Sequence, residues 1–345
     1  MSLKSAGRFL LHRCGGLHAL RQLHRRGLRI LMYHRFPAGE SEAFEHQCAH
    51  LQRYYRPVSM RQVAESLHQG KALPAHAVAV TVDDGYRDFY ETAYPVLQAY
   101  GIPATVYLVT DFLDGQAWAW WDQVHYCFQR SRLETVSVPL GQESLEFALR
   151  TSKERGQAAD RLIETLKTLP NAVRLQVLGS LPSLFQVALP EEAPPEAAFL
   201  RWEEVRRMAG QGIEFGVHTR THPILAALNE QELAAEILES RDRLAQELSQ
   251  PPIHFSYPNG RWVDIGEAAL RAVKQAGFLT AMTTEAGVNR PPRRALLLER
   301  IGAEPSGPSL DYFQRCLALG QESVRLGLPV RLRRASLPAA VPTLQ

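Results

Sequence analysis

Residues 78–82, VAVTV, form a short apolar run that ends at two adjacent carboxylates, Asp83 and Asp84, followed by Gly85. Apolar and β-branched side chains in such a run favour a buried strand. In α/β folds, functional sites are built where strands end and loops begin. Two neighbouring acids at that point could divide the work, one holding a cation and the other handling protons. The alternative is an ordinary Asp-Gly turn.

Strands and helices are expected to alternate along most of the chain. Apolar runs predict strands at 29–33, 104–109, 213–217, 254–257, 278–284 and 296–301, in addition to the run before Asp83. Segments with helical periodicity lie between them, including one that Ser59 could cap and that stops at Gly70. This pattern predicts an α/β fold with a parallel sheet, as in a (β/α) barrel or a strained variant of one.

The alternation is interrupted between about residues 118 and 200. Apolar residues recur at helical spacing over 159–169, and the segment ends in the proline- and acid-rich stretch 189–198. We therefore expect a mostly helical insertion within a main domain at 28–305. Residues 1–27 are expected to form a basic amphipathic segment, and residues 306–345 a C-terminal helix and a disordered tail.

Composition limits the possible partners. The chain has 345 residues, a hydrophobic fraction of 45% and a formal net charge of +3, which is too small to argue for a nucleic-acid partner. Its basic residues are concentrated before residue 30, where no acid occurs. A basic amphipathic helix there could contact an anionic membrane peripherally, or it could pack on its own domain.

The expected location is cytoplasmic. The apolar run at 9–11 is interrupted by His12 and Arg13, so it is shorter than the core of about 7–15 residues that a secretory signal needs. The four cysteines are scattered and form no paired motif, which suits a reducing compartment.

A pair of histidines follows the expected strand at 213–217. His218 and His222 are four residues apart, so their imidazoles could bind one cation. Such a pair is weak support alone, because most are surface residues. Together with a carboxylate from the end of another strand, they would make a set of one acid and two histidines that leaves coordination positions open.

Three motifs in order resemble those of a known family. TVDDGY at 81–86, HTRTH at 218–222 and FSYPNG at 255–260 each follow an expected strand. Together they resemble the signature motifs of the polysaccharide deacetylase family, metal-dependent carbohydrate esterases related to chitooligosaccharide deacetylases. The segments LMYHRF at 31–36 and 281–301 also resemble the family's bacterial branch. The resemblance covers roughly residues 28–305 and implies a distorted (β/α) barrel of about seven strands.

The resemblance also implies roles for individual residues. Carried over by position, Asp84, His218 and His222 would bind one divalent metal, and Asp83 would be the general base. We expect zinc, although cobalt, nickel or iron would accept the same ligands. The backbone N–H of Asn259 would help to stabilise a tetrahedral oxyanion.

Two positions depart from the family's pattern. Ser256 stands where many relatives carry an arginine that braces the catalytic aspartate, and Arg220 or Arg87 could replace that brace. The stretch Leu298–Arg300 stands where many relatives carry a histidine that acts as general acid. His34, at the end of the first expected strand, or a protonated Asp83 could supply the proton instead.

The expected activity is removal of an N-acetyl group from an acetamido sugar in a polysaccharide, oligosaccharide or glycolipid precursor. A deformylase or another small-amide hydrolase on the same metal centre is the alternative enzyme. A catalytically silent glycan-binding protein is the alternative of another class. Trp118, Trp120 and Trp121 could stack on the carbohydrate or pack the insertion against the barrel.

Overall fold

The computed structural model describes residues 16–141, 143–291 and 293–320. The expectations for residues 1–15 and for the tail at 321–345 therefore lie outside the described residues. Within the described residues, no helix is both long and apolar enough to cross a membrane.

Seven parallel strands close into a barrel. The closing strand is β1 (Arg29–Tyr33), which pairs in parallel with both β3 (Ala77–Val82) and β10 (Leu298–Gly302). Around the barrel from β3 follow β4 (Ala104–Leu108), β7 (Ile213–Val217), β8 (His254–Ser256) and β9 (Thr280–Ala286). The two-residue strand β2 (Arg56–Pro57) pairs with the beginning of β3. The predicted distorted barrel of about seven strands is thus confirmed.

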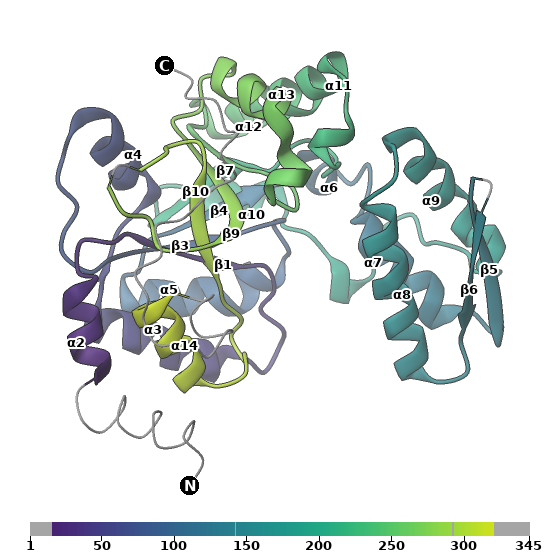
Figure 1. The fold of residues 1–345 in the computed structure, drawn as a ribbon, viewed down its shortest axis with the longest axis horizontal. Coiled ribbons are helices and arrows are strands. Elements are labelled where there is room, and N and C mark those ends of the chain that lie inside the picture. Colours follow the sequence, from purple (N-terminus) through teal and green to yellow (C-terminus); the bar gives the residue numbers. More distant parts are fainter. Residues whose placement is uncertain (1–15, 142, 292, 321–345) are drawn as a thin grey trace, which may run out of the picture.

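Helices cover the outside of this barrel (Figure 1). Their bounds are α2 (Gly16–Leu23), α3 (Ser41–Tyr54), α4 (Met60–Gln69), α5 (Tyr94–Tyr100), α6 (Thr110–Leu113), α10 (Trp202–Met208), α11 (Glu230–Ala234), α12 (Ser240–Leu248), α13 (Trp262–Gln275) and α14 (Leu310–Leu319). Local sequence sets several of their ends. Ser59 and Gln62 form a capping box at the start of α4, and Gly70 ends it in the left-handed conformation. All six residues of β3 are buried between the barrel interior and the helices, as their apolar character predicts.

The insertion forms a separate lobe beside the barrel, drawn in teal in Figure 1. It consists of α7 (Trp120–Arg130), α8 (Ser152–Leu166), α9 (Asn171–Phe185) and a hairpin of β5 (Thr135–Leu140) and β6 (Glu143–Ala148). The antiparallel hairpin is a feature that the sequence patterns did not indicate. Residues from all five elements share one apolar core, so the lobe has its own packing. The chain returns from it beside the loop after β3, where Leu200 N donates to Gly85 O at 2.9 Å.

Candidate metal centre and active site

Asp83 and Asp84 lie directly after β3, at the end of the barrel where the strands finish. Both are buried, with 1% and 5% of their surfaces exposed. Asp83 N donates to Tyr33 O at 2.9 Å, so β1 fixes the start of the turn. Asp84 and Gly85 then adopt positive φ angles of 71° and 78°. An aspartate in this region is uncommon, and such strain is concentrated at functional sites, so the turn is more than a simple connection.

The histidine motif forms a tightly held loop after β7. Thr219 and His222 both have positive φ angles, 67° and 59°, and His222 N donates to Thr219 Oγ1 at 3.0 Å. The carboxylate of Glu236 accepts hydrogen bonds from the backbone N–H groups of Arg220 and Thr221, each at 2.9 Å. These hydrogen bonds fix the backbone of the loop, and the backbone in turn fixes the positions of its two histidines.

Asp84, His218 and His222 converge on one point. The Nε2 atoms of His218 and His222 lie 3.4 and 3.6 Å from Asp84 Oδ1, and one ligand atom from each of the three residues lies within 4.8 Å of the others. Zinc ligands at about 2.0–2.2 Å from a tetrahedral ion are separated from one another by about 3.4 Å. The three donors therefore fit a divalent cation in both type and spacing.

The orientation of His218 and the protonation of His222 also suit a metal. His218 Nδ1 donates to the backbone carbonyl of Ser256 at 2.7 Å, which leaves the Nε2 lone pair facing Asp84. Burial, followed by repulsion from His218, lowers the pKa of His222 to about 3, so its imidazole is neutral at physiological pH. Its Nδ1 is buried and has no hydrogen-bond partner among the described residues. A neutral, desolvated imidazole is the state that a metal ligand requires.

Asp83 stands beside this set and is held by Arg300, a residue of β10. Arg300 Nη1 donates to Asp83 Oδ1 at 2.8 Å and Nη2 donates to Oδ2 at 2.6 Å, in a bidentate pair with both residues 1% exposed. Burial raises the pKa of the Asp83 carboxyl, but Arg300 and then His218 outweigh burial and hold that pKa well below its ordinary value. Asp83 is therefore ionised and fixed in orientation.

Arg300 replaces the missing brace, and the candidates suggested from sequence were wrong. Arg220 pairs with Glu239 at 2.7 Å, and Arg87 pairs with Glu204 at 3.0 Å, both away from Asp83. The short side chain of Ser256 belongs to the new arrangement: its hydroxyl accepts from Arg300 Nη2 at 3.2 Å and donates to Asp83 Oδ2 at 3.3 Å. Arg300 lies in the stretch 298–300, where a histidine was expected, and no local sequence pattern marks it as a partner of Asp83.

His34 and Asn259 flank the same site. His34 is exposed at the end of β1. Burial raises the pKa of Asp84, but the neighbouring histidines, His34 among them, outweigh burial and lower that pKa. Asn259 follows β8 with a φ of 56°, and its carbonyl accepts from Thr284 Oγ1 at 2.5 Å. Its side-chain Nδ2 is buried without a partner among the described residues.

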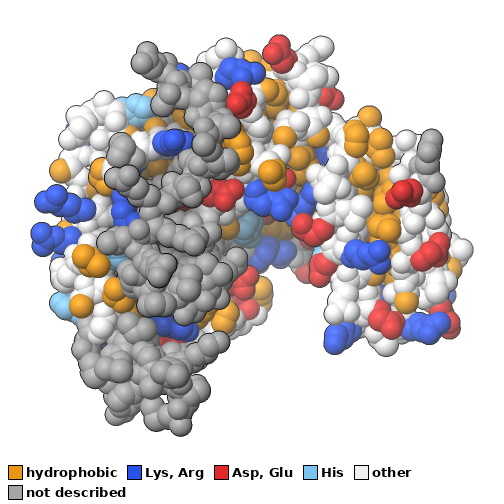
Figure 2. Space-filling view, in the orientation of Figure 1, with side chains coloured by type: hydrophobic (Ala, Val, Ile, Leu, Met, Phe, Trp, Pro, Cys, Tyr) orange, Lys and Arg blue, Asp and Glu red, His pale blue; other side chains and the backbone are white. Residues whose placement is uncertain are grey.

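The insertion contributes a further group of residues that the motifs did not indicate. The ring of Trp121, in α7, lies 4.6 Å from the ring of His222 and edge-on to it. Trp121 Nε1 donates to the hydroxyl of Tyr86 at 2.8 Å, and that hydroxyl donates to Asp122 Oδ2 at 2.7 Å. Burial raises the pKa of Asp122 to about 6. Figure 2 shows the surface hollowed between the barrel and the insertion, and α7 lies where the two meet.

The three tryptophans differ in their surroundings. Trp118 and Trp120 are each 6% exposed and pack in apolar clusters at the base of the insertion. Only Trp121 reaches the candidate metal ligands. Core packing thus accounts for two of these residues and a position at the site for the third.

This barrel and its motifs match a known sequence family. The sequence model described as "Polysaccharide deacetylase" matches residues 70–136 and 157–281, which is more than half of the chain. The chain belongs to the polysaccharide deacetylase family.

Two relatives differ in how much of the chain they match. The poly-beta-1,6-N-acetyl-D-glucosamine N-deacetylase of Escherichia coli (strain K12) is 40% identical over 84 residues, which is 24% of this chain but 12% of that protein. This chain thus covers only a small part of that relative's length. The polysaccharide deacetylase named YxkH in Bacillus subtilis (strain 168) is 23% identical over 287 residues, covering 81% of this chain and 72% of that protein.

Solved structures support the fold. The Streptococcus pyogenes deacetylase PplD in complex with acetate aligns with a TM-score of 0.53 at 20% identity, covering 81% of this chain and 93% of that one. IcaB from Ammonifex degensii aligns with a TM-score of 0.52 at 19% identity, covering 84% and 97%. At these identities the likeness concerns the fold alone.

Proposed function

We propose that this protein is a metal-dependent hydrolase that removes the N-acetyl group from an acetamido sugar in a polysaccharide, oligosaccharide or glycolipid precursor. The observation that carries the proposal is the convergence of Asp84, His218 and His222 beside a second carboxylate, Asp83, that Arg300 holds ionised. Membership of the polysaccharide deacetylase family and the names of the matched relatives agree with it.

Each residue has a chemical task in this proposal. Asp84, His218 and His222 would hold one divalent ion, zinc in our proposal, which when bound supplies electrophilic activation of the amide carbonyl and the attacking water. Asp83 accepts the proton of the attacking water, since it is ionised, fixed and beside the ion's ligands. Arg300 orients Asp83 and keeps it charged without touching substrate.

The remaining steps fall to the flanking residues. The backbone N–H of Asn259 would donate to the developing oxyanion from a loop held by Thr284. The amine leaving group needs a proton, and the exposed imidazole of His34 can reach solvent and substrate at the end of β1. A silent glycan-binding protein is less well supported than an enzyme, because the brace that seemed absent is provided by Arg300.

The test combines metal analysis of the purified protein with release of acetate and formate from acetamido and formamido sugars. We expect one zinc per chain and release of acetate, with a loss of at least about a hundredfold in Asp83→Asn. Release of formate without release of acetate would identify the activity as deformylation and not deacetylation. Stoichiometric metal with no release of acetate or formate, by the wild type or by Asp83→Asn, would refute the proposal that this protein is an enzyme. A His34→Ala variant with unchanged turnover and metal content would remove His34 from the mechanism.

We also propose a cytoplasmic location with peripheral contact between the basic N-terminal segment and the membrane. The buried thiols of Cys48 and Cys127, together with the basic character of the first thirty residues, support this placement. Cell fractionation that recovers the protein outside the cytoplasm and membrane fractions would contradict it.

A further inference from the structure

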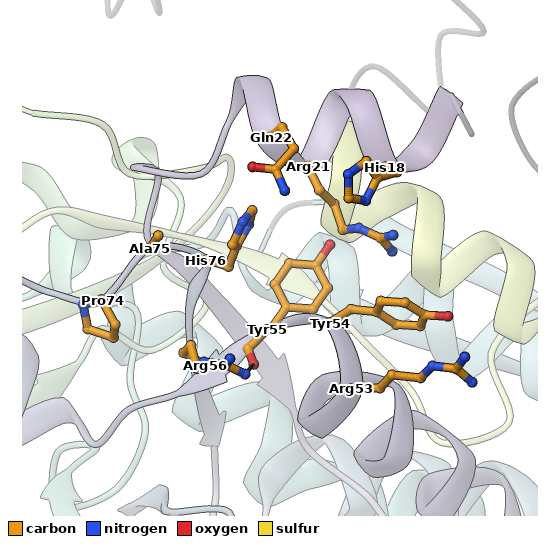
Figure 3. Close-up of a pocket in the computed structure, with 10 residues that line it drawn as sticks. All are labelled: His18, Arg21, Gln22, Arg53, Tyr54, Tyr55, Arg56, Pro74, Ala75 and His76. Atoms are coloured by element: carbon orange, nitrogen blue, oxygen red, sulfur yellow. Dashed lines mark hydrogen bonds between the residues drawn. The ribbon is translucent and has the colours of Figure 1, made fainter. Parts of the chain in front are cut away.

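A basic pocket lies at the opposite end of the barrel from the metal centre. It has a volume of about 380 Å³ and is formed by α2, the end of α3 and the starts of β2 and β3 (Figure 3). Arg56 begins β2 and His76 directly precedes β3, whereas Asp83 directly follows β3. Six strand residues at about 3.3 Å each separate the two ends by roughly 20 Å. The pocket is therefore a separate site and not an extension of the catalytic hollow.

The pocket is positively charged without compensation. Its lining includes Arg21, Arg53, Arg56, His18 and His76, and it contains no aspartate or glutamate. Within residues 16–320 as described, none of the three arginines forms an ion pair with a carboxylate, whereas many other arginines of this chain do. Unpaired arginines gathered around a concave surface favour an anionic ligand.

An aromatic ring, in place of acids, holds two of these arginines. The guanidinium of Arg21 lies 4.2 Å from the ring centre of Tyr54, and that of Arg53 lies 5.2 Å from the same ring. Stacking on a ring orients the cation but does not use its N–H donors, which stay available to a ligand. Figure 3 shows Arg21 reaching from α2 toward the ring of Tyr54.

Arginines of the pocket add to the effect of burial on two histidines. Burial, followed by Arg29, Arg21, Arg25 and Arg56, lowers the pKa of His76. Burial, followed by Arg21 and Arg53, lowers the pKa of His50, which lies behind the pocket, to about 4.

The wall of the pocket also holds a polar atom without a partner. Nδ1 of His76 is buried and has no hydrogen-bond partner among the described residues. His76 also has a positive φ of 62°, an uncommon conformation for a residue other than glycine. An unpaired ring nitrogen and local backbone strain both favour a site that is arranged for a ligand.

We propose that this pocket binds a phosphate group, carried by a soluble phosphate ester or by a phospholipid headgroup. Phosphate suits it better than a carboxylate, because a phosphate monoester brings up to two charges and three acceptor oxygens to three arginines. The volume admits the phosphate together with part of the molecule that carries it. Leu23, at the end of α2, exposes 64% of its surface beside the pocket and would suit a lipid carrier.

The test uses the full-length protein and two probes. The first probe is inorganic phosphate, titrated by calorimetry against chloride of equal ionic strength. The second is sedimentation with phosphatidylcholine vesicles that contain or lack phosphatidic acid. The variant is Arg21→Gln/Arg53→Gln, which removes two exposed or half-exposed side chains and leaves the barrel core intact. Its control is Arg150→Gln combined with Arg130→Gln, which removes the same charge from the insertion.

We expect the Arg21→Gln/Arg53→Gln variant to weaken binding by roughly tenfold per arginine, and the control variant by less than about twofold. Loss of phosphate binding in solution identifies a soluble ester as the source. Loss confined to vesicles containing phosphatidic acid identifies a lipid headgroup. The proposal is refuted if neither probe binds the wild-type protein better than chloride or neutral vesicles, or if both double variants weaken binding equally. Unchanged zinc content and circular dichroism would show that the variants are folded.

Discussion

Replacing Arg300 with methionine is the most direct test of how the site is built. Arg300 and Asp83 are each 1% exposed and are joined by two charge-assisted hydrogen bonds of 2.8 and 2.6 Å. Methionine fills a similar volume but leaves the carboxylate buried without its cation. Breaking a buried pair in this way costs about 3–5 kcal/mol of unfolding free energy. Because Arg300 is the strongest of the groups that lower the pKa of Asp83, we also expect that pKa to rise in the variant.

Equilibrium denaturation in urea measures this cost, and a double-mutant cycle assigns it. Arg300→Met and Asp83→Asn remove the two sides of one pair, so their effects should not add. We expect the double variant to be more stable than the sum of the single effects predicts, by about 2 kcal/mol or more. Acetate release should fall by at least about a hundredfold in Arg300→Met, because the base loses the bidentate pair that orients it.

Arg220→Met is the matched control. Arg220 belongs to the histidine motif, but its side chain is 40% exposed and pairs with Glu239 at the surface. Its replacement should cost less than about 1 kcal/mol and change acetate release only a few-fold. Equal losses of stability in Arg300→Met and Arg220→Met would refute the inference that Arg300 braces Asp83. Additive effects of Arg300→Met and Asp83→Asn would also refute it.

Three further outcomes are expected. Zinc added to chelator-treated protein should raise the unfolding temperature by several degrees in the wild type and leave Asp84→Ala unchanged, as measured by calorimetry, because the ion binds only the folded state. His50, whose pKa falls from 6.5 to about 4 on burial, binds fewer protons folded than unfolded, so its contribution is present above pH 6.5 and lost as the pH falls toward 4. Between pH 7 and pH 5, the free energy of unfolding of the wild type should therefore fall by about 2 kcal/mol more than that of His50→Phe, as measured by urea denaturation. Gly260→Ala should abolish acetate release and destabilise the protein by more than about 1 kcal/mol, since φ is +67° and a Cβ would lie 2.6 Å from Thr284 N; wild-type stability would contradict this.

The parts of the fold that depend on local sequence could be predicted. Apolar runs located the strands, and the bounds expected for 213–217 match those of β7. The capping residues around α4 were also evident, since a cap involves groups only three residues apart. The hairpin in the insertion was missed because its alternation of buried and exposed residues is short and follows a strong helical pattern.

The ligand candidates were predictable for a related reason. Asp84, His218 and His222 each follow a recognisable strand, and the ends of parallel strands meet at one end of a barrel. The placement of Trp121 was not predictable, because it depends on how the insertion packs against the barrel. No local pattern reports the orientation of one lobe on another.

The brace depends on closure of the barrel, which no local pattern reveals. β10 and β3 do not pair with each other; they lie on either side of β1, where Leu31 pairs with both Ile301 and Val80. The backbone of Arg300 therefore lies below the level of the carboxylates, and its side chain extends up the barrel interior. Its Nη1 lies 3.4 Å from Thr81 Oγ1 and donates to Asp83 Oδ1. A short side chain at 256 is needed along this path. An arginine at both positions would give one buried carboxylate two cations, leaving an uncompensated charge that costs several kcal/mol. The serine that appeared to be a defect in the motif is thus the counterpart of the arginine on β10.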